Sequence, residues 1–161
     1  DGATLSRTLH DRVDVGIAVD MPEGLYVPVL RDVGPRDAAS LRDDLEQLKA
    51  AIDVRALTPS DLRGPTISIS NFGTIGGHHA ALLLMPPQVA ILGIGTVADR
   101  VVPVDGKPVV RQTAPLSLTF DHRAVTGGEA ARFLTTVIDE LEGGAEMARI
   151  GMKATGATEN A

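Results

Sequence analysis

Short apolar runs alternate along this chain with two segments of helical periodicity, and this alternation restricts the fold to a mixed α/β class. The apolar runs are rich in Val, Ile and Leu and are bounded by turn-forming residues. They predict strands at residues 13–20, 25–31, 66–70, 88–98 and 114–122. Asp105-Gly106 lies between two further runs, 101–104 and 109–112, and this arrangement predicts a β-hairpin.

Helical periodicity occurs in two places. From Arg36 to Ile52, leucines recur every three or four residues with charged residues between them. The segment 130–141 places its large apolar residues on one face. Thr58-Pro59-Ser60-Asp61 predicts a short capped helix, because threonine accepts from first-turn amides and proline suits the first helical position. Small and polar residues dominate the end of the chain, and we expect residues 153–161 to form a flexible tail.

The composition fits one globular domain whose core contains few aromatic side chains. Of 161 residues, 43% are hydrophobic and 2% are aromatic, so Val, Ile, Leu and Ala must fill the core. The absence of cysteine excludes disulfides, thiolate metal sites and a cysteine nucleophile. The formal net charge is −6 and the basic residues are scattered, so nucleic acid is not an expected partner. No apolar run approaches roughly 18 residues and no secretory signal opens the chain, so we expect no membrane partner and a cytoplasmic location.

The strongest candidate for a reactive side chain is His122, which follows the last predicted strand in the stretch FDHRAVTGG. A side chain at a strand end can face a cleft, and a neutral imidazole is a suitable general base near neutral pH. A single histidine at a strand end is more often a polar residue at the rim of a fold, so His122 alone does not define an active site. His78-His79 has no third ligand at useful spacing, so we expect no metal.

Four blocks of the sequence together resemble one family. FDHRAVTGG is similar to the FDHRxxDG signature of the dihydrolipoamide acyltransferase catalytic domains of 2-oxo acid dehydrogenase complexes. VGIAVDMPEGLYVPVLRDV resembles that family's paired strands, LTPSDLRGPTISISNFGTIGG resembles its short helix and TISNxG strand, and MPPQVAILGIG resembles its NPPQxAILGxG segment. We therefore expect an acyltransferase catalytic domain over residues 1–152, without the helix and strand that open the domain in longer relatives.

The resemblance implies an α/β fold like that of chloramphenicol acetyltransferase, with a mixed sheet and helices packed against it. It implies acyl transfer between a dihydrolipoyl thioester and coenzyme A, in homotrimers that build a larger cage. The implied partners are the decarboxylase and dihydrolipoamide dehydrogenase components and a lipoyl domain outside this segment. Acetyl, branched-chain acyl and succinyl transferases share these motifs, so the acyl group stays open. A local arginine cluster could hold the phosphates of coenzyme A.

The resemblance also implies roles for individual residues. His122 matches the family's base, which takes the proton of the attacking thiol. Ser70 matches the serine that donates a hydrogen bond to the oxyanion. Asp20 and Asn71 match positions that contact coenzyme A in relatives, so we expect them to bind coenzyme A with Ser70.

Thr126 departs from the family pattern, which has an aspartate four residues after the histidine and ties it to an arginine. Thr126 carries no charge, but Thr126-Gly127-Gly128-Glu129 has the form of a capping box at the start of the final helix. Its place in the motif keeps it among the candidate catalytic residues, although capping is the expected role. Asp121 and Arg123 are expected to form a structural pair that fixes the turn around His122.

Two other functions remain open from the sequence. A core subunit that has lost activity would fit the missing carboxylate at Thr126, whereas retention of His122 favours an active enzyme. A stand-alone acetyltransferase of the chloramphenicol type is disfavoured by the TISNFG-like and PPQVAILGIG blocks. Few charges occur between Ile75 and Ala98, and large apolar surfaces usually mark subunit contacts. Three apolar residues near the end of the chain are candidates for an anchor between trimers: Met147, Ile150 and Met152.

Overall fold

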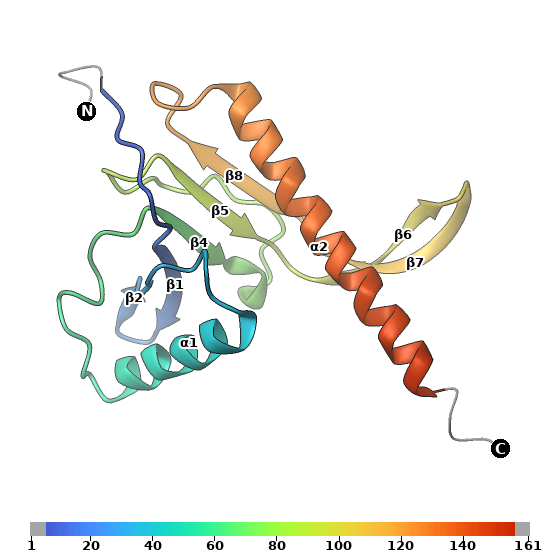
Figure 1. Ribbon diagram of the computed structural model, residues 1–161, viewed down its shortest axis with the longest axis horizontal. Coiled ribbons are helices and arrows are strands. Elements are labelled where there is room, and N and C mark those ends of the chain that lie inside the picture. Colours follow the sequence, from blue (N-terminus) through green and yellow to red (C-terminus); the bar gives the residue numbers. More distant parts are fainter. Residues whose placement is uncertain (1–5, 157–161) are drawn as a thin grey trace. The chain divides into compact units, whose positions relative to one another are not determined.

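A mixed sheet of six strands has the order β2-β1-β4-β5-β8, and the short strand β3 also pairs with β1 (Figure 1). The computed structural model describes residues 6–156, with side chains described as far as Gly143. The strands of the sheet are β1 (Val15–Met21), β2 (Gly24–Tyr26), β3 (Val29–Leu30), β4 (Ile67–Asn71), β5 (Ala90–Ile94) and β8 (Leu116–Phe120). β1, β4 and β5 run parallel to one another, and β8 runs antiparallel to β5. The predicted mixed α/β class is confirmed.

The chain divides into two units, one ending at Ala124 and the other beginning at Val125. The first holds the sheet, the helix α1 (Ala38–Asp53), the 3-10 turn η1 (Phe72–Ile75) and a separate hairpin, and the second holds the helix α2 (Gly127–Gly156). The core of the first unit is aliphatic, as the composition predicts. Its buried hydrophobic residues are Val15, Val29, Leu30, Ile52 and Leu92.

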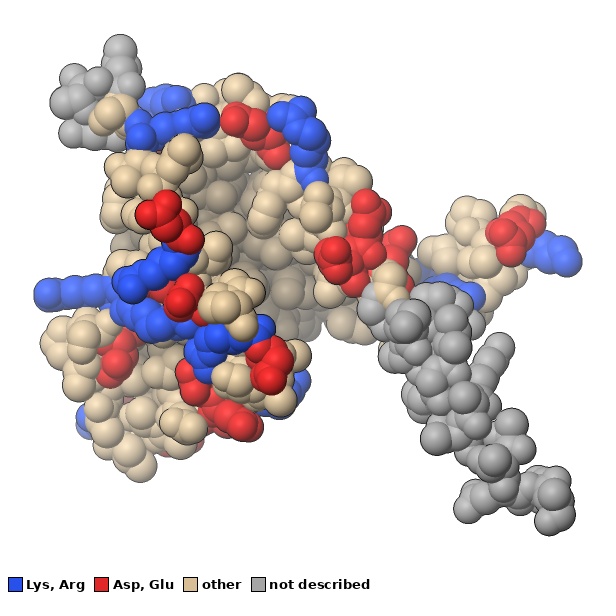
Figure 2. All heavy atoms as spheres, viewed as in Figure 1, with Lys and Arg blue, Asp and Glu red and all other residues tan. Residues whose placement is uncertain are grey.

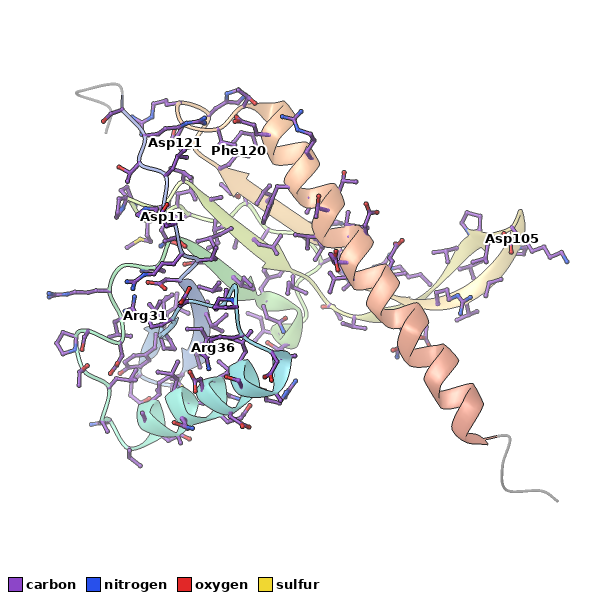
Figure 3. All side chains as sticks on the ribbon, in the orientation of Figure 1. Asp11, Arg31, Arg36, Asp105, Phe120 and Asp121 are labelled. Atoms are coloured by element: carbon purple, nitrogen blue, oxygen red, sulfur yellow. The ribbon has the colours of Figure 1, made fainter. Side chains whose placement is uncertain are left out.

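The hairpin of β6 (Ala98–Val104) and β7 (Lys107–Thr113) is confirmed where the sequence predicts it. Asp105 and Gly106 have φ angles of 50° and 74°, which lie in the left-handed region that a two-residue hairpin turn requires. Asp105 marks the tip, away from the six-stranded sheet (Figure 3).

Both predicted helices are present. The Asp37 side chain caps α1 by accepting from the backbone N–H of Ser40 at 2.7 Å. α2 is longer than predicted and continues to Gly156, so residues 153–156 are helical where we expected a tail. Lys153 and Ala154 are good helix formers, and they follow a run of Ala, Glu, Met and Arg residues within α2. The rest of that tail, and the side chains of the three proposed anchor residues, lie outside the described residues.

Two predicted strands are shorter than the apolar runs that indicated them. The run 25–31 divides into β2 and β3 at Pro28, which has no N–H to donate but accepts from the N–H of Ile17 at 2.9 Å. The run 88–98 forms sheet only over β5. Beyond it, the Thr96 N–H donates to the carbonyl of Gly77 at 2.8 Å, so the chain leaves the sheet to hold the turn that follows β4.

The predicted short helix at Thr58–Asp61 is wrong, and this segment forms a turn. The Asp61 carboxylate accepts from both the N–H and the hydroxyl of Thr58, at 2.8 Å each. The Thr58 hydroxyl therefore donates to Asp61 instead of capping a helix. The Asp61 carbonyl also accepts from the Val29 N–H at 2.9 Å, which holds the turn against the sheet.

A buried carboxylate connects separate segments around β1. Asp14 is 2% exposed; it accepts from Arg31 Nη1 at 3.1 Å and from the Asp32 N–H at 2.8 Å. Desolvation raises the pKa of Asp14, but these hydrogen bonds and the charges of Arg12 and Arg31 outweigh it, so the pKa lies below its ordinary value. Arg31 also donates to the carbonyls of Ser60 and Arg63, at 2.7 Å each, and so ties that loop to β3.

Candidate functional site

His122 is exposed in the turn that follows β8. Phe120 and Asp121 mark this end of the strand (Figure 3). The Asp121 N–H donates to the Val89 carbonyl at 2.8 Å, and the Ala124 N–H donates to the Asp121 carbonyl at 3.0 Å. The His122 ring lies 5.4 Å from the Phe120 ring, centroid to centroid, with a tilt of 42°. The turn therefore has a defined backbone, and one face of the imidazole has an aromatic neighbour.

Asp121 and Arg123 form a tight ion pair on either side of His122, as predicted. The Asp121 carboxylate accepts from the Arg123 guanidinium at distances down to 2.7 Å and from the Arg123 N–H at 2.9 Å. Hydrogen bonds from the Arg123 side chain and backbone lower the pKa of Asp121 to about 2. The Asp121 side chain also raises the pKa of Arg123. Both groups remain charged near neutral pH, so the pair restrains the turn and transfers no proton.

The segment that precedes β1 also holds this turn. Arg7 Nη1 donates to the carbonyl of Ala124 at 3.0 Å, across 117 residues of sequence. The sequence analysis did not identify Arg7, because nothing in the local pattern of an irregular segment indicates a contact so distant in the chain.

Thr126 and Glu129 form the predicted capping box. The Glu129 carboxylate accepts from the N–H and the hydroxyl of Thr126, at 2.8 Å each, and the Glu129 N–H donates to Thr126 Oγ1 at 3.2 Å. The helix α2 begins at the next residue, Gly127. The Thr126 hydroxyl is therefore used in capping.

The other candidate residues gather where β1 and β4 end. Ser70 pairs with Ala18 of β1 and Gly93 of β5, and Asn71 pairs with Ile94. Asp20 lies two residues beyond Ala18 on the parallel strand β1, so it reaches the same carboxyl edge of the sheet. Ser70 is half-buried, whereas Asn71 and Asp20 are exposed. The structure thus brings these three residues to one edge.

An open pocket of about 250 Å³ adjoins this edge. Asn71, Gly73 and Thr74 line one part of it, and residues 94–97 line the other. Close backbone contact shapes it, since a Cβ at Gly73 would overlap the backbone of Gly95. Thr96 Oγ1 donates to the Gly73 carbonyl at 3.1 Å and fixes η1. Thr96 is another structural residue that the sequence analysis missed.

Strand register separates His122 from Ser70 within one chain. Ser70 lies level with Gly93 on β5, whereas Phe120 lies level with Ala90. These levels differ by three residues along β5, and β4 and β8 flank β5 on opposite sides, so the Ser70 and Phe120 backbones are roughly 14 Å apart. His122 lies beyond Phe120, on the side away from Ser70. One chain therefore does not bring the predicted base and the predicted oxyanion donor together.

The other histidines show no metal-site geometry. His78 Nδ1 lies 3.2 Å from Arg100 Nη2, and the described residues hold no group of three or more His, Asp or Glu side chains that could bind a metal ion. Within that same part of the chain, no helix has the length and apolar character needed to cross a membrane.

The parallel strands β1, β4 and β5, the antiparallel strand β8 and the histidine turn that follows it form a mixed α/β domain. Residues 2–149 match the family described as 2-oxoacid dehydrogenases acyltransferase (catalytic domain). The chain belongs to this family, and the resemblance found in the sequence is confirmed.

Curated relatives include components of two complexes. The dihydrolipoyllysine-residue acetyltransferase component of the pyruvate dehydrogenase complex of Corynebacterium glutamicum is 38% identical over 143 residues, covering 86% of this chain and 21% of the relative. The mitochondrial dihydrolipoyllysine-residue succinyltransferase component of the 2-oxoglutarate dehydrogenase complex of Mus musculus is 37% identical over 142 residues, covering 88% of this chain and 31% of the relative. The chain thus spans less than a third of the length of either relative.

Solved structures agree with the fold. A dihydrolipoamide acetyltransferase of Azotobacter vinelandii superposes with a TM-score of 0.76 at 36% identity, covering 81% of this chain and 54% of that chain. The cubic core of a pyruvate dehydrogenase multienzyme complex superposes with a TM-score of 0.74 at 36% identity, covering 78% of this chain and 52% of that chain.

Proposed function

We propose that this domain transfers an acyl group from a dihydrolipoyl thioester to coenzyme A, with His122 as general base and Ser70 as oxyanion donor. One observation carries the assignment of residues. The A. vinelandii structure concerns a serine, a histidine and an asparagine in the catalytic mechanism, separated in sequence by 52 and 4 residues. Ser70, His122 and Thr126 have these same separations. This matching spacing, in a relative that superposes with this fold, supports the assignment of the three positions.

The chemistry follows from these side chains. A thiol has an ordinary pKa near 8.5, so it needs a base to attack as a thiolate at neutral pH. The neutral His122 imidazole takes the proton from the coenzyme A sulfur, which then bonds to the thioester carbonyl carbon. Ser70 Oγ donates to the resulting oxyanion. Collapse of this intermediate breaks the bond to the dihydrolipoyl sulfur, which recovers the proton from His122.

We propose that each site forms between two subunits, with His122 from one chain and Ser70 from its neighbour. The separation of roughly 14 Å between the Ser70 and Phe120 backbones supports this arrangement, because no direct contact within one chain is available. Asp20 and Asn71 lie at the same edge as Ser70, which supports their assignment to coenzyme A. The Asp121–Arg123 pair and Arg7 orient His122 in place of the ion pair that an aspartate at position 126 would form.

The proposed assembly is a homotrimer within a larger closed cage, as the cubic core of the solved relative illustrates. Large exposed apolar side chains support association, because patches of this kind usually mark interfaces. From the last residue of η1 to the start of β6, these side chains are Ile75, Leu83, Met85 and Val97, which are 60–82% exposed. The proposed partners are the decarboxylase and dihydrolipoamide dehydrogenase components and a lipoyl domain outside this segment. The proposed location is the cytoplasm.

The test uses purified oligomeric protein, coenzyme A and a panel of acyl-dihydrolipoamides. His122→Ala is expected to abolish transfer while the mass of the assembly is retained, because the base is lost. His79→Ala is the matched control, since His79 is an exposed histidine outside the proposed site. Near-normal turnover in the His122→Ala variant, with normal assembly, would contradict the assignment.

A second variant tests the oxyanion donor. Ser70→Ala should lower kcat by about 10²–10³ with little change in coenzyme A binding, as for the loss of one oxyanion donor. A change confined to KM would instead identify Ser70 as a binding residue. Ser117→Ala, on β8 of the same sheet, serves as the control.

A further inference from the structure

The β6–β7 hairpin carries its basic side chains on one face. The register places Arg100 of β6 directly opposite Arg111 of β7. Lys107 lies four residues before Arg111 on β7, next to the turn at the tip of the hairpin. Because side chains alternate along a strand, these three cations share a face, and Asp99 belongs to the other. Asp105 lies in the turn between the strands. The basic face of the hairpin, defined by Arg100, Arg111 and Lys107, therefore contains no carboxylate of its own strands.

Among the residues that the structure describes, neither arginine has a carboxylate partner. Like charges directly opposite each other destabilise a strand pair. Arg100 Nη2 contacts His78 Nδ1 at 3.2 Å, which supplies no negative charge, and half-buried Arg111 forms no hydrogen bond or ion pair with any residue that the structure describes. Over α1, by contrast, acidic and basic side chains are interspersed (Figure 2). The positive charge of the basic face is therefore not neutralised by any residue that the structure describes.

An unpaired hydroxyl lies at the base of the same face. Thr113 is two residues from Arg111 on β7 and so shares its side of the hairpin. Thr113 Oγ1 is buried, and the described part of the chain offers it no hydrogen-bond partner. Such groups are uncommon in folded proteins and call for an explanation. This end of the hairpin therefore carries an unsatisfied polar group two residues from Arg111.

The basic face begins where the pocket beside Ser70 ends. Val97 lines that pocket, β6 starts at the next residue, and Arg100 follows three residues after Val97. Asn71 lines the opposite side of the same pocket. A long ligand with its reactive end at Ser70 could therefore place an anionic end on the hairpin.

We propose that Arg100 and Arg111 bind a phosphate group of the substrate. This identification rests on the proposed function, in which the phosphate belongs to the nucleotide end of coenzyme A. Guanidinium groups bind phosphate through charge-assisted, often bidentate hydrogen bonds. A phosphate between the two side chains also removes their mutual repulsion.

The test is a calorimetric titration of the oligomeric full chain with 3′-phospho-ADP, the nucleotide fragment of coenzyme A, which has no thiol. Arg100→Gln and Arg111→Gln are each expected to weaken binding about tenfold, as for the loss of a hydrogen bond between charged groups. Inorganic phosphate should compete in the wild-type protein. Arg42→Gln, which changes an exposed arginine on α1, is the matched control and should bind normally.

Unchanged binding of 3′-phospho-ADP in both hairpin variants overturns the phosphate site. A smaller assembly in light scattering with unchanged nucleotide binding also overturns it, and would identify the arginines as contacts between copies of the chain. The titration does not depend on acyl transfer. Suppose that the wild-type protein binds 3′-phospho-ADP, that both variants weaken this binding, and that the wild-type protein shows no acyl transfer. This result would reject the proposed function and leave the phosphate site standing.

Discussion

At the scale of single residues, the Asp121–Arg123 pair makes a pH-dependent contribution to stability. The folded pKa of Asp121 is about 2, below its ordinary value of 3.8. A carboxylate with a lowered pKa stabilises the fold above its unfolded pKa, and this contribution is lost as the pH falls through the folded pKa. The pair should therefore act fully at neutral pH and weaken between about pH 4 and pH 2.

Asp121→Asn tests this window. The variant should have a lower melting temperature than the wild type at pH 7, and the difference should shrink as the pH falls toward 2, because the wild-type carboxylate is then protonated. Asp43→Asn, at an exposed position on α1, controls for the loss of one charge. The measurement is thermal unfolding followed by circular dichroism. A difference that stayed constant from pH 7 to pH 2 would mean that the ion pair does not stabilise the turn.

Thr126 tests whether capping or catalysis explains the departure from the family motif. Thr126→Ala should lower the free energy of unfolding by about 1 kcal/mol, because the capping box loses its hydroxyl. Thr126→Asp should retain the cap, since aspartate is also a favoured N-cap residue. Thr135→Ala, at an exposed position on α2, is the control, and urea denaturation is the measurement. Loss of catalysis in the Thr126→Ala variant without loss of stability would assign the hydroxyl a chemical role.

At the scale of elements, the turn after β4 depends on the close approach of two backbones. A Cβ at Gly73 would overlap the carbonyl group of Gly95, and neither backbone can move without disturbing the Thr96 hydrogen bonds. Gly73→Ala should therefore destabilise the fold by about 1–3 kcal/mol, as for overpacking. It should also lower kcat/KM, because η1 follows Ser70 and Asn71 directly.

Gly34→Ala is the matched control, because a Cβ there meets nothing within 4 Å. Its expected effect is neutral or a gain of about 0.4–1 kcal/mol from reduced chain entropy in the unfolded state. Urea unfolding measures both variants. Equal stability of the two proteins would show that the turn relaxes without penalty.

The success of sequence-based prediction differs among the elements for physical reasons. α1 and the hairpin carry their signals locally, in leucine spacing and in Asp105-Gly106, and both are confirmed. The end of β5 depends on Thr96 reaching across to Gly77, a contact that no local pattern encodes. At Thr58–Asp61 the capping residues are correct for a helix, but the Asp61 carboxylate accepts from the Thr58 N–H and closes a turn instead.

At the scale of the whole molecule, the candidate site was only partly predictable from the sequence. The position of His122 at a strand end follows from the local alternation of apolar and polar residues. The Asp121–Arg123 ion pair follows from the two residues that flank His122. Ser70, Asn71 and Asp20 were identified only through resemblance to a family, since their residue types are common at strand ends. The register then shows that His122 lies at one end of the strands, whereas Ser70, Asn71 and Asp20 lie at the other end. A site that uses residues from both ends of the strands therefore requires a second chain.

Complementation between inactive variants tests this arrangement. Co-expression of His122→Ala and Ser70→Ala chains at equal levels should yield mixed trimers. If each site takes His122 from one chain and Ser70 from the next around a closed ring, random association makes about a quarter of the sites intact. The pooled protein should then recover about a quarter of wild-type turnover, whereas each variant alone stays inactive or nearly so. The control mixes the two variants after separate purification, when subunits do not exchange. Turnover of the co-expressed protein no higher than this control, with mixed trimers confirmed by native mass spectrometry, would place both residues in one chain and contradict the register argument.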